Sequence, residues 1–191
     1  MNLFLAFDFT NFVGRFHPIL VHLPIGFLLL GILMEWYQRR GKTEKLSNLI
    51  AYAWLLGAIG GAFAAFCGWW LGETGLYFED DLFLHRWAGI LIVIISFIGW
   101  RLKKNNEQHS RTKHHVANFL ILGLLLFEGH LGGNLTHGAS YLFEYAPESV
   151  RNFMLDEKSE IVDLSKSDSV LVYKDLVKPI LQQKCFACLL Y

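Results

Sequence analysis

The chain has 191 residues, of which 53% are hydrophobic and 18% are charged. Its mean hydropathy is +0.34, and apolar runs of about twenty residues recur along it, so a lipid bilayer is the expected solvent. The formal net charge is zero, which gives no reason to expect a nucleic-acid partner. These properties exclude an ordinary soluble domain and predict membrane lipid as the immediate partner of the chain.

Four segments are long enough to cross a hydrocarbon core as helices, at a rise of about 1.5 Å per residue. They are residues 16–36, 47–72, 84–102 and 115–137. The connections between them are short, so we expect sequential helices to pack antiparallel. The predicted fold class is therefore all-α: an integral membrane four-helix bundle over residues 1–138, with a short periplasmic C-terminal extension.

The basic residues predict the orientation, because Lys and Arg near helix ends resist translocation and mark the cytoplasmic side. Segment 37–45 carries four of them and segment 101–115 carries five, whereas segments 1–15 and 73–86 carry one each. We therefore expect a multi-pass protein of a bacterial inner membrane, with the N-terminus and the C-terminus both on the periplasmic side.

Small residues recur every four positions in the second span, in two adjacent rows. The rows are Gly57, Gly61 and Ala65, and Gly60, Ala64 and Gly68. Rows of this kind let a neighbouring backbone or a flat cofactor approach closely. Helix packing alone is the simpler interpretation, and a bound cofactor is the alternative.

Histidines are the residues that indicate chemistry. Three of the eight, His109, His114 and His115, lie in the basic cytoplasmic loop or at its edge, and they are interpreted as surface residues. The other five all map to the outer half of the membrane: His17, His22, His85, His130 and His137. Ionisable or metal-ligating side chains are costly at membrane depth, so several at one level predict a cofactor or metal site.

Counting residues along straight helices places His22 roughly 9 Å and His130 roughly 10 Å below the outer surface. Opposed imidazoles on different helices of a bundle hold haem iron in membrane b-type cytochromes. The hypothesis is therefore that His22 and His130 ligate the iron of a haem b. His85 and His137 are the next candidates, either for a second haem or for its propionates, and His17 is expected to cap or hydrogen-bond at the rim.

Zinc or copper could use the same imidazoles. The apolar surroundings and the lack of a tight pair four residues apart make a compact metal site less favoured than haem. Glu128, two residues before His130, could tune a haem or relay a proton, and a polar contact between helices explains it equally well.

Several histidine motifs together resemble a known family. They are residues 15–26 (RFHPILVHLPIG), 84–89 (LHRWAG), 129–133 (GHLGG) and 136–138 (THG). The combination resembles the bacterial membrane family catalogued as domain of unknown function 2231, over about residues 10–140. Members of that family look like small multi-pass bundles, some joined to Rieske or cytochrome c modules. The resemblance therefore implies a role in membrane electron transfer.

Beyond residue 138 the composition changes, and residues 139–168 are interpreted as a periplasmic linker. Within residues 169–191, the run VKPILQQKCFAC is similar to the opening of planctomycete-type cytochrome c domains, which implies that Cys185 and Cys188 attach haem. Leu189 stands where the haem-ligand histidine would follow. Either the chain is a fragment of a longer cytochrome, in which case haem c is expected, or the two cysteines form a plain thiol pair; we favour the fragment.

The leading hypothesis is a haem-binding membrane anchor that passes electrons between the membrane and a periplasmic cytochrome c module. Its partners would be redox proteins or a larger membrane complex. Whether it is an enzyme is left open, and an electron-transfer or structural subunit is favoured over a stand-alone enzyme. The first alternative is a structural subunit that tethers a periplasmic domain to such a complex, with histidines that only hydrogen-bond. A metal or proton path is a second alternative, disfavoured because the inner half offers almost no polar residue besides Glu35.

Overall fold

The computed structural model describes residues 9–42, 46–73, 77, 79–105, 111–138, 141–143, 145–154, 173, 177 and 181. The long helices are α3 (His22–Tyr37), α4 (Ser47–Gly72), α5 (Glu79–Lys104) and α6 (Arg111–His137). The short ones are α1 (Phe9–Gly14), α2 (His17–Leu20), the π-type turn η1 (Gln38–Lys42) and α7 (Glu148–Met154). Within these ranges every regular element is a helix, so the all-α prediction is confirmed.

Four stretches are long and apolar enough to cross a membrane: Phe9–Gly41, Ser47–Gly72, Asp81–Lys104 and Thr112–His137. The second coincides with the predicted span, and the third and fourth extend the predicted ones by a few residues. The first span is broken into α1, α2 and α3, because Pro18 and Pro24 lack the N–H that a continuous helix needs. It ends at Gly41, whose φ of 75° is a left-handed conformation that glycine adopts without strain.

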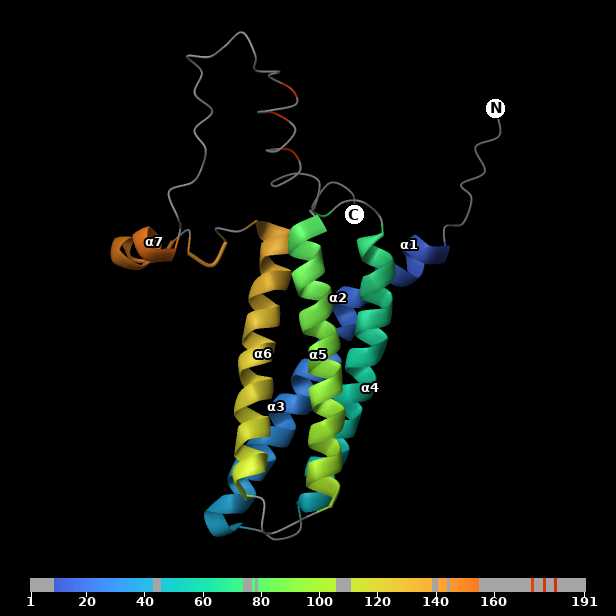
Figure 1. Ribbon diagram of the computed structural model, residues 1–191, viewed down its shortest axis with the longest axis vertical. Helices are drawn as coiled ribbons and strands as arrows, with labels where there is room; N and C mark the ends of the chain where they lie inside the picture. The colour runs from blue at the N-terminus through green and yellow to red at the C-terminus, as the bar shows by residue number, and fades with distance from the viewer. Residues whose placement is uncertain are drawn as a thin grey trace.

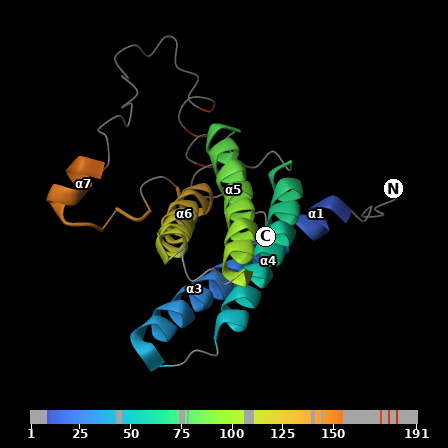
Figure 2. The same cartoon turned by 60° about the horizontal axis from the view of Figure 1, so that its bottom comes forward.

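The helices do not form an upright square. In Figure 1, α4, α5 and α6 run roughly side by side, whereas α3 crosses them diagonally, and Figure 2 shows the same crossing from a second direction. α1, α2 and α3 pack mainly on α4, and α5 lies between α4 and α6. We call the end of the bundle that holds Gly72, His85 and His137 the histidine end; Lys42 and Lys104 lie at the opposite end.

The middle of the bundle is packed around Trp54, which has no exposed surface. Glycines on two helices make room for its indole: a Cβ at Gly99 would lie 2.1 Å from Trp54 Cζ3, and one at Gly31 would lie 2.8 Å from Cδ1. Gly57 similarly accommodates Leu28, so this part of the small-residue rows serves helix packing. The apolar layer consists of Leu28, Ile50, Trp54, Ile92, Ala117 and Ile121.

A buried polar network lies between this layer and the end opposite the histidines. Glu35 Oε2 accepts hydrogen bonds from Lys103 Nζ at 2.5 Å and Asn118 Nδ2 at 2.9 Å, while Oε1 binds Arg39. His114 Nδ1 lies 3.3 Å from Glu35 Oε1. Two expectations are therefore wrong: His114 is not a surface residue, and this half of the bundle contains more than one polar group.

Candidate functional site: a cavity between the four spans

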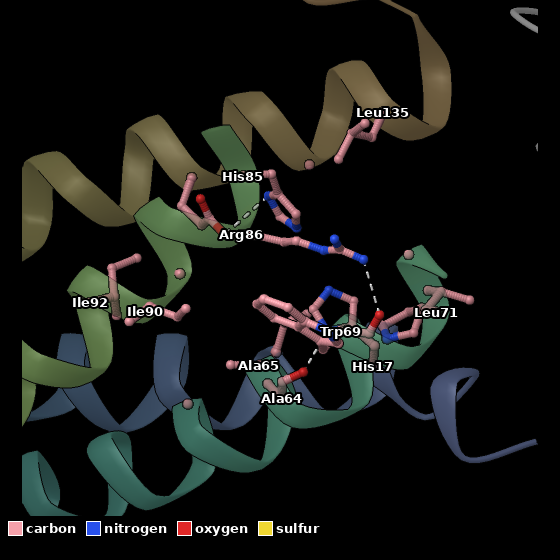
Figure 3. Close-up of a pocket in the computed structure, with 18 of the residues that line it drawn as sticks. His17, Ala64, Ala65, Trp69, Leu71, His85, Arg86, Ile90, Ile92 and Leu135 are labelled. Carbon is pink, nitrogen blue, oxygen red and sulfur yellow. Dashed lines mark hydrogen bonds and ion pairs between the residues drawn. The ribbon is translucent and has the colours of Figure 1, made fainter. Parts of the chain in front are cut away.

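A cavity of about 560 Å³ opens at the histidine end, lined by residues from α2, α3, α4, α5 and α6. Its volume is within the range of about 300–1,000 Å³ that is typical of small-molecule and cofactor sites. Most of the lining is apolar, and four charged or imidazole side chains converge on it (Figure 3): His17, His85, Arg86 and Glu128. A mostly apolar pocket with a few convergent polar groups is the usual form of a ligand site.

Each of the four side chains lies against a glycine of another helix, and at three of these glycines an added Cβ would crowd the side chain. A Cβ at Gly68 would lie 2.6 Å from His17 Nδ1, and one at Gly72 would lie 2.5 Å from Arg86 Nη2. The remaining pairs are Gly89 with Glu128 and Gly132 with His85. The small residues of α4 therefore have two roles. Gly68 and Gly72 leave space for cavity side chains, whereas Gly57 allows close packing of α3 on α4.

His17 and His85 face each other across this space. Their ring centres are 6.0 Å apart and their planes are nearly perpendicular, at 89°. In Figure 3, His85 and His17 are drawn above and below the Arg86 side chain; His17 belongs to α2 and His85 to α5. The structure thus brings together two imidazoles that are distant in sequence and come from different spans.

The Nδ1 atom of each ring lies close to an oxygen atom. His17 Nδ1 donates to the carbonyl oxygen of Ala64 at 2.8 Å, and His85 Nδ1 lies 3.0 Å from Glu128 Oε1. The second contact has ion-pair distance but falls short of hydrogen-bond alignment, and the buried Glu128 Oε2 has no partner. Because the Ala64 carbonyl oxygen accepts from His17 Nδ1, the proton lies on that nitrogen and Nε2 of His17 keeps its lone pair. His85 Nδ1 is buried and makes no aligned hydrogen bond.

Arg86 is the fourth polar residue of the cavity. Its guanidinium lies 4.6 Å above the Trp69 ring, and Nη2 donates to Glu73 Oε1 at 2.9 Å and to the Trp69 carbonyl oxygen at 3.2 Å. In the sequence, Arg86 is the single basic residue of segment 73–86 and is interpreted there only as a loop charge. Its position directly after His85, inside the LHRWAG motif, was the available signal.

The other histidines of the hypothesis lie elsewhere. His22 is exposed and its Nδ1 donates to the Pro18 carbonyl oxygen at 2.8 Å, while Asn134 Nδ2 donates to His130 Nε2 at 3.3 Å. His137 is exposed at the end of α6. No hydrogen bond or ring contact joins His22 to His130 in the structure, so their pairing on one iron stays a prediction.

The cysteine motif cannot be placed, because Cys185 and Cys188 lie outside the described residues. The boundaries of the linker and tail, at 139–168 and 169–191, also fall mainly on undescribed parts of the chain. Within the described part, no three His, Cys, Asp or Glu side chains gather as a metal-ion cluster. Haem iron needs fewer protein ligands than such a cluster, because two imidazoles are sufficient to hold it.

Comparison with known proteins adds one finding. A family model described as "Predicted membrane protein (DUF2231)" matches residues 15–140, which include all four polar residues of the cavity. No curated protein and no solved structure matches the chain. The family match stops before the tail, so the resemblance of that segment to a cytochrome c domain stays a prediction.

Proposed function

This chain belongs to the DUF2231 family of membrane proteins, and on that premise we propose that it binds haem b and transfers electrons. His17 and His85, rather than His22 and His130, are the proposed iron ligands. The observation that carries the proposal is the facing pair of imidazoles, 6.0 Å between ring centres, in an apolar cavity.

The distance fits two ligands on one iron. Two imidazole nitrogens that bind a metal from opposite sides at about 2 Å each put the ring centres about 6 Å apart. His17 and His85 have this separation. Perpendicular ring planes are compatible with the arrangement, because each imidazole can rotate about its own bond to the metal.

The surroundings of the two rings support the same proposal. Metal-ligating histidines donate their second ring N–H to a carbonyl or carboxylate, which fixes the tautomer and the ring orientation. Ala64 supplies the carbonyl that accepts from His17 Nδ1. The Glu128 carboxylate lies 3.0 Å from His85 Nδ1, close enough to accept from it after a small rotation of the side chain. By contrast, His130 Nε2 already accepts a hydrogen bond from Asn134.

Bound haem would supply one-electron chemistry, and the protein would orient the group and exclude water from it. The proposed partners are redox proteins or a larger membrane complex, as in the sequence-based hypothesis. The count of basic residues supports a bacterial inner membrane with the histidine end on the periplasmic side. A periplasmic partner would then exchange electrons with the site.

Visible spectroscopy of four matched histidine variants tests the proposal. The protein is purified in detergent after expression with abundant haem, and the haem type is determined by pyridine haemochrome analysis. His17→Ala and His85→Ala are expected to lose the low-spin spectrum, while His22→Ala and His130→Ala keep it. Circular dichroism of each variant shows that the helices are intact.

Two results would contradict the assignment. The reverse pattern among the four variants would return the ligand role to His22 and His130. Wild-type protein that takes up no haem would refute the haem proposal, and the structural tethering subunit would then be the better function.

A further inference from the structure

We infer that Arg86 binds a carboxylate of the ligand that occupies the cavity. The site would thus take an amphipathic anion, with its apolar body among the spans and its carboxylate at Arg86. This inference rests on the proposed function, in which the carboxylate is a propionate of haem b. It goes further by assigning the orientation of the ligand and its charge.

Arg86 provides the charge that such a ligand needs. Among the described residues that line the cavity, it is the one Lys or Arg. An arginine stays protonated at all ordinary pH values. In an apolar pocket its attraction for an anion is screened less than in water, so the carboxylate of a ligand is expected at this position.

The Arg86 guanidinium is held in place and still has one N–H without a hydrogen-bond partner. Stacking on Trp69 and the bond from Nη2 to the Trp69 carbonyl fix its plane. Gly72 leaves the space that the group occupies. The Nε–H of Arg86 is buried and has no hydrogen-bond partner. A carboxylate can accept from Nε–H and an Nη–H together, and this two-bond geometry is one that arginine favours.

The present carboxylate partner of Arg86 is easily exchanged. Glu73 lies at the end of α4 with 58% of its side chain exposed, so its ion pair contributes little. It can turn into solvent when a ligand arrives. Glu128, the carboxylate that lines the cavity, lies against His85 instead. Arg86 is therefore left with a replaceable surface partner.

The test compares haem b with its dimethyl ester, which has the same ring and iron but no propionate charge. Each porphyrin is titrated into detergent-solubilised apoprotein, and the low-spin absorption band reports binding. Wild-type protein is expected to bind haem about 10- to 100-fold more tightly than the ester, the usual effect of a charge-assisted hydrogen bond. Arg86→Gln should remove that preference by weakening haem binding and leaving ester binding unchanged.

Two further variants separate the charge of Arg86 from its two-bond geometry and remove its present carboxylate partner. Arg86→Lys keeps the positive charge but cannot form two parallel hydrogen bonds to one carboxylate, so it should retain part of the preference for haem over the ester. Glu73→Gln frees the guanidinium, so haem binding should be at least as tight as in the wild type. Equal wild-type affinity for haem and ester would overturn the inference without any variant, and so would Arg86→Gln weakening both equally. In each case the haem function would stand, whereas wild-type protein that binds neither porphyrin would overturn both.

Discussion

Replacing Glu35 by Gln should destabilise the bundle by about 3–5 kcal/mol, because it leaves a buried charge without its counter-ion. The charge is that of Lys103, whose side chain is 1% exposed and whose Nζ lies 2.5 Å from Glu35 Oε2. Its other contacts are neutral: Asn118 Oδ1 at 2.9 Å and the Trp54 ring at 4.6 Å. Neither compensates the ammonium as a carboxylate does.

The reciprocal change, Lys103→Met, should cost less, about 1–3 kcal/mol. The Glu35 carboxylate would still be paired with Arg39, whose side chain is 24% exposed, and hydrogen-bonded to Asn118. The double variant should cost less than the sum of the two single variants, because it removes both charges together. The structure thus predicts an unequal pair of effects with a favourable coupling.

Equilibrium unfolding in detergent micelles, followed by circular dichroism and tryptophan fluorescence, measures these free energies. Lys104→Met is the matched control: it makes the same change at the neighbouring, exposed lysine and should stay within about 0.5 kcal/mol of the wild type. Equal costs for Glu35→Gln and Lys103→Met that simply add in the double variant would refute the reasoning. So would a cost below about 1 kcal/mol for Glu35→Gln.

Three more predictions concern the cavity and the orientation. Gly68→Ala should lower haem affinity about tenfold or more, because the added methyl group displaces His17. Gly123→Ala is the control: a Cβ there meets nothing within 4 Å, so haem affinity should not change. Equal effects of the two variants in haem titrations would count against the site. Glu128→Gln should weaken haem binding by about 10- to 100-fold if the carboxylate orients His85, and an unaltered titration curve would deny it that role. Topology reporters should read cytoplasmic after residues 42 and 107 and periplasmic after residues 79 and 150, and a reversed pattern would invert the site's location.

The spans could be predicted from sequence because length and apolarity decide them. α4 illustrates this: its run from Ser47 to Gly72 contains no proline and no charge, and the helix has the predicted bounds. The ligand pair could not be predicted in the same way. The depth count treated the first span as a straight, upright helix, whereas it breaks at Val21 and continues as the diagonal α3. His17 and His22 are five residues apart, roughly 140° around a helix. The structure has His17 at the cavity and His22 exposed.

The polar network was missed for a different reason. Lys103 was counted as one of the charges that keep a loop in the cytoplasm, and Asn118 has no sequence pattern that links it to Glu35. Their positions are 68 and 83 residues from Glu35, so the contacts arise from the packing of three spans. A charge pattern along a chain predicts orientation, but it does not show whether a single lysine also forms a buried ion pair.

The apolar layer around Trp54 lies between two polar regions of the protein, the cavity and the Glu35 network. Leu28, Trp54, Ile92 and Ile121 are each at most 5% exposed, and they lie between the cavity and the Glu35 network. An ion or proton crossing this layer would lose its hydration among apolar side chains, which supply no charge or hydrogen bond to replace it. We therefore expect this layer to be a barrier to protons and ions between the cavity and the Glu35 network.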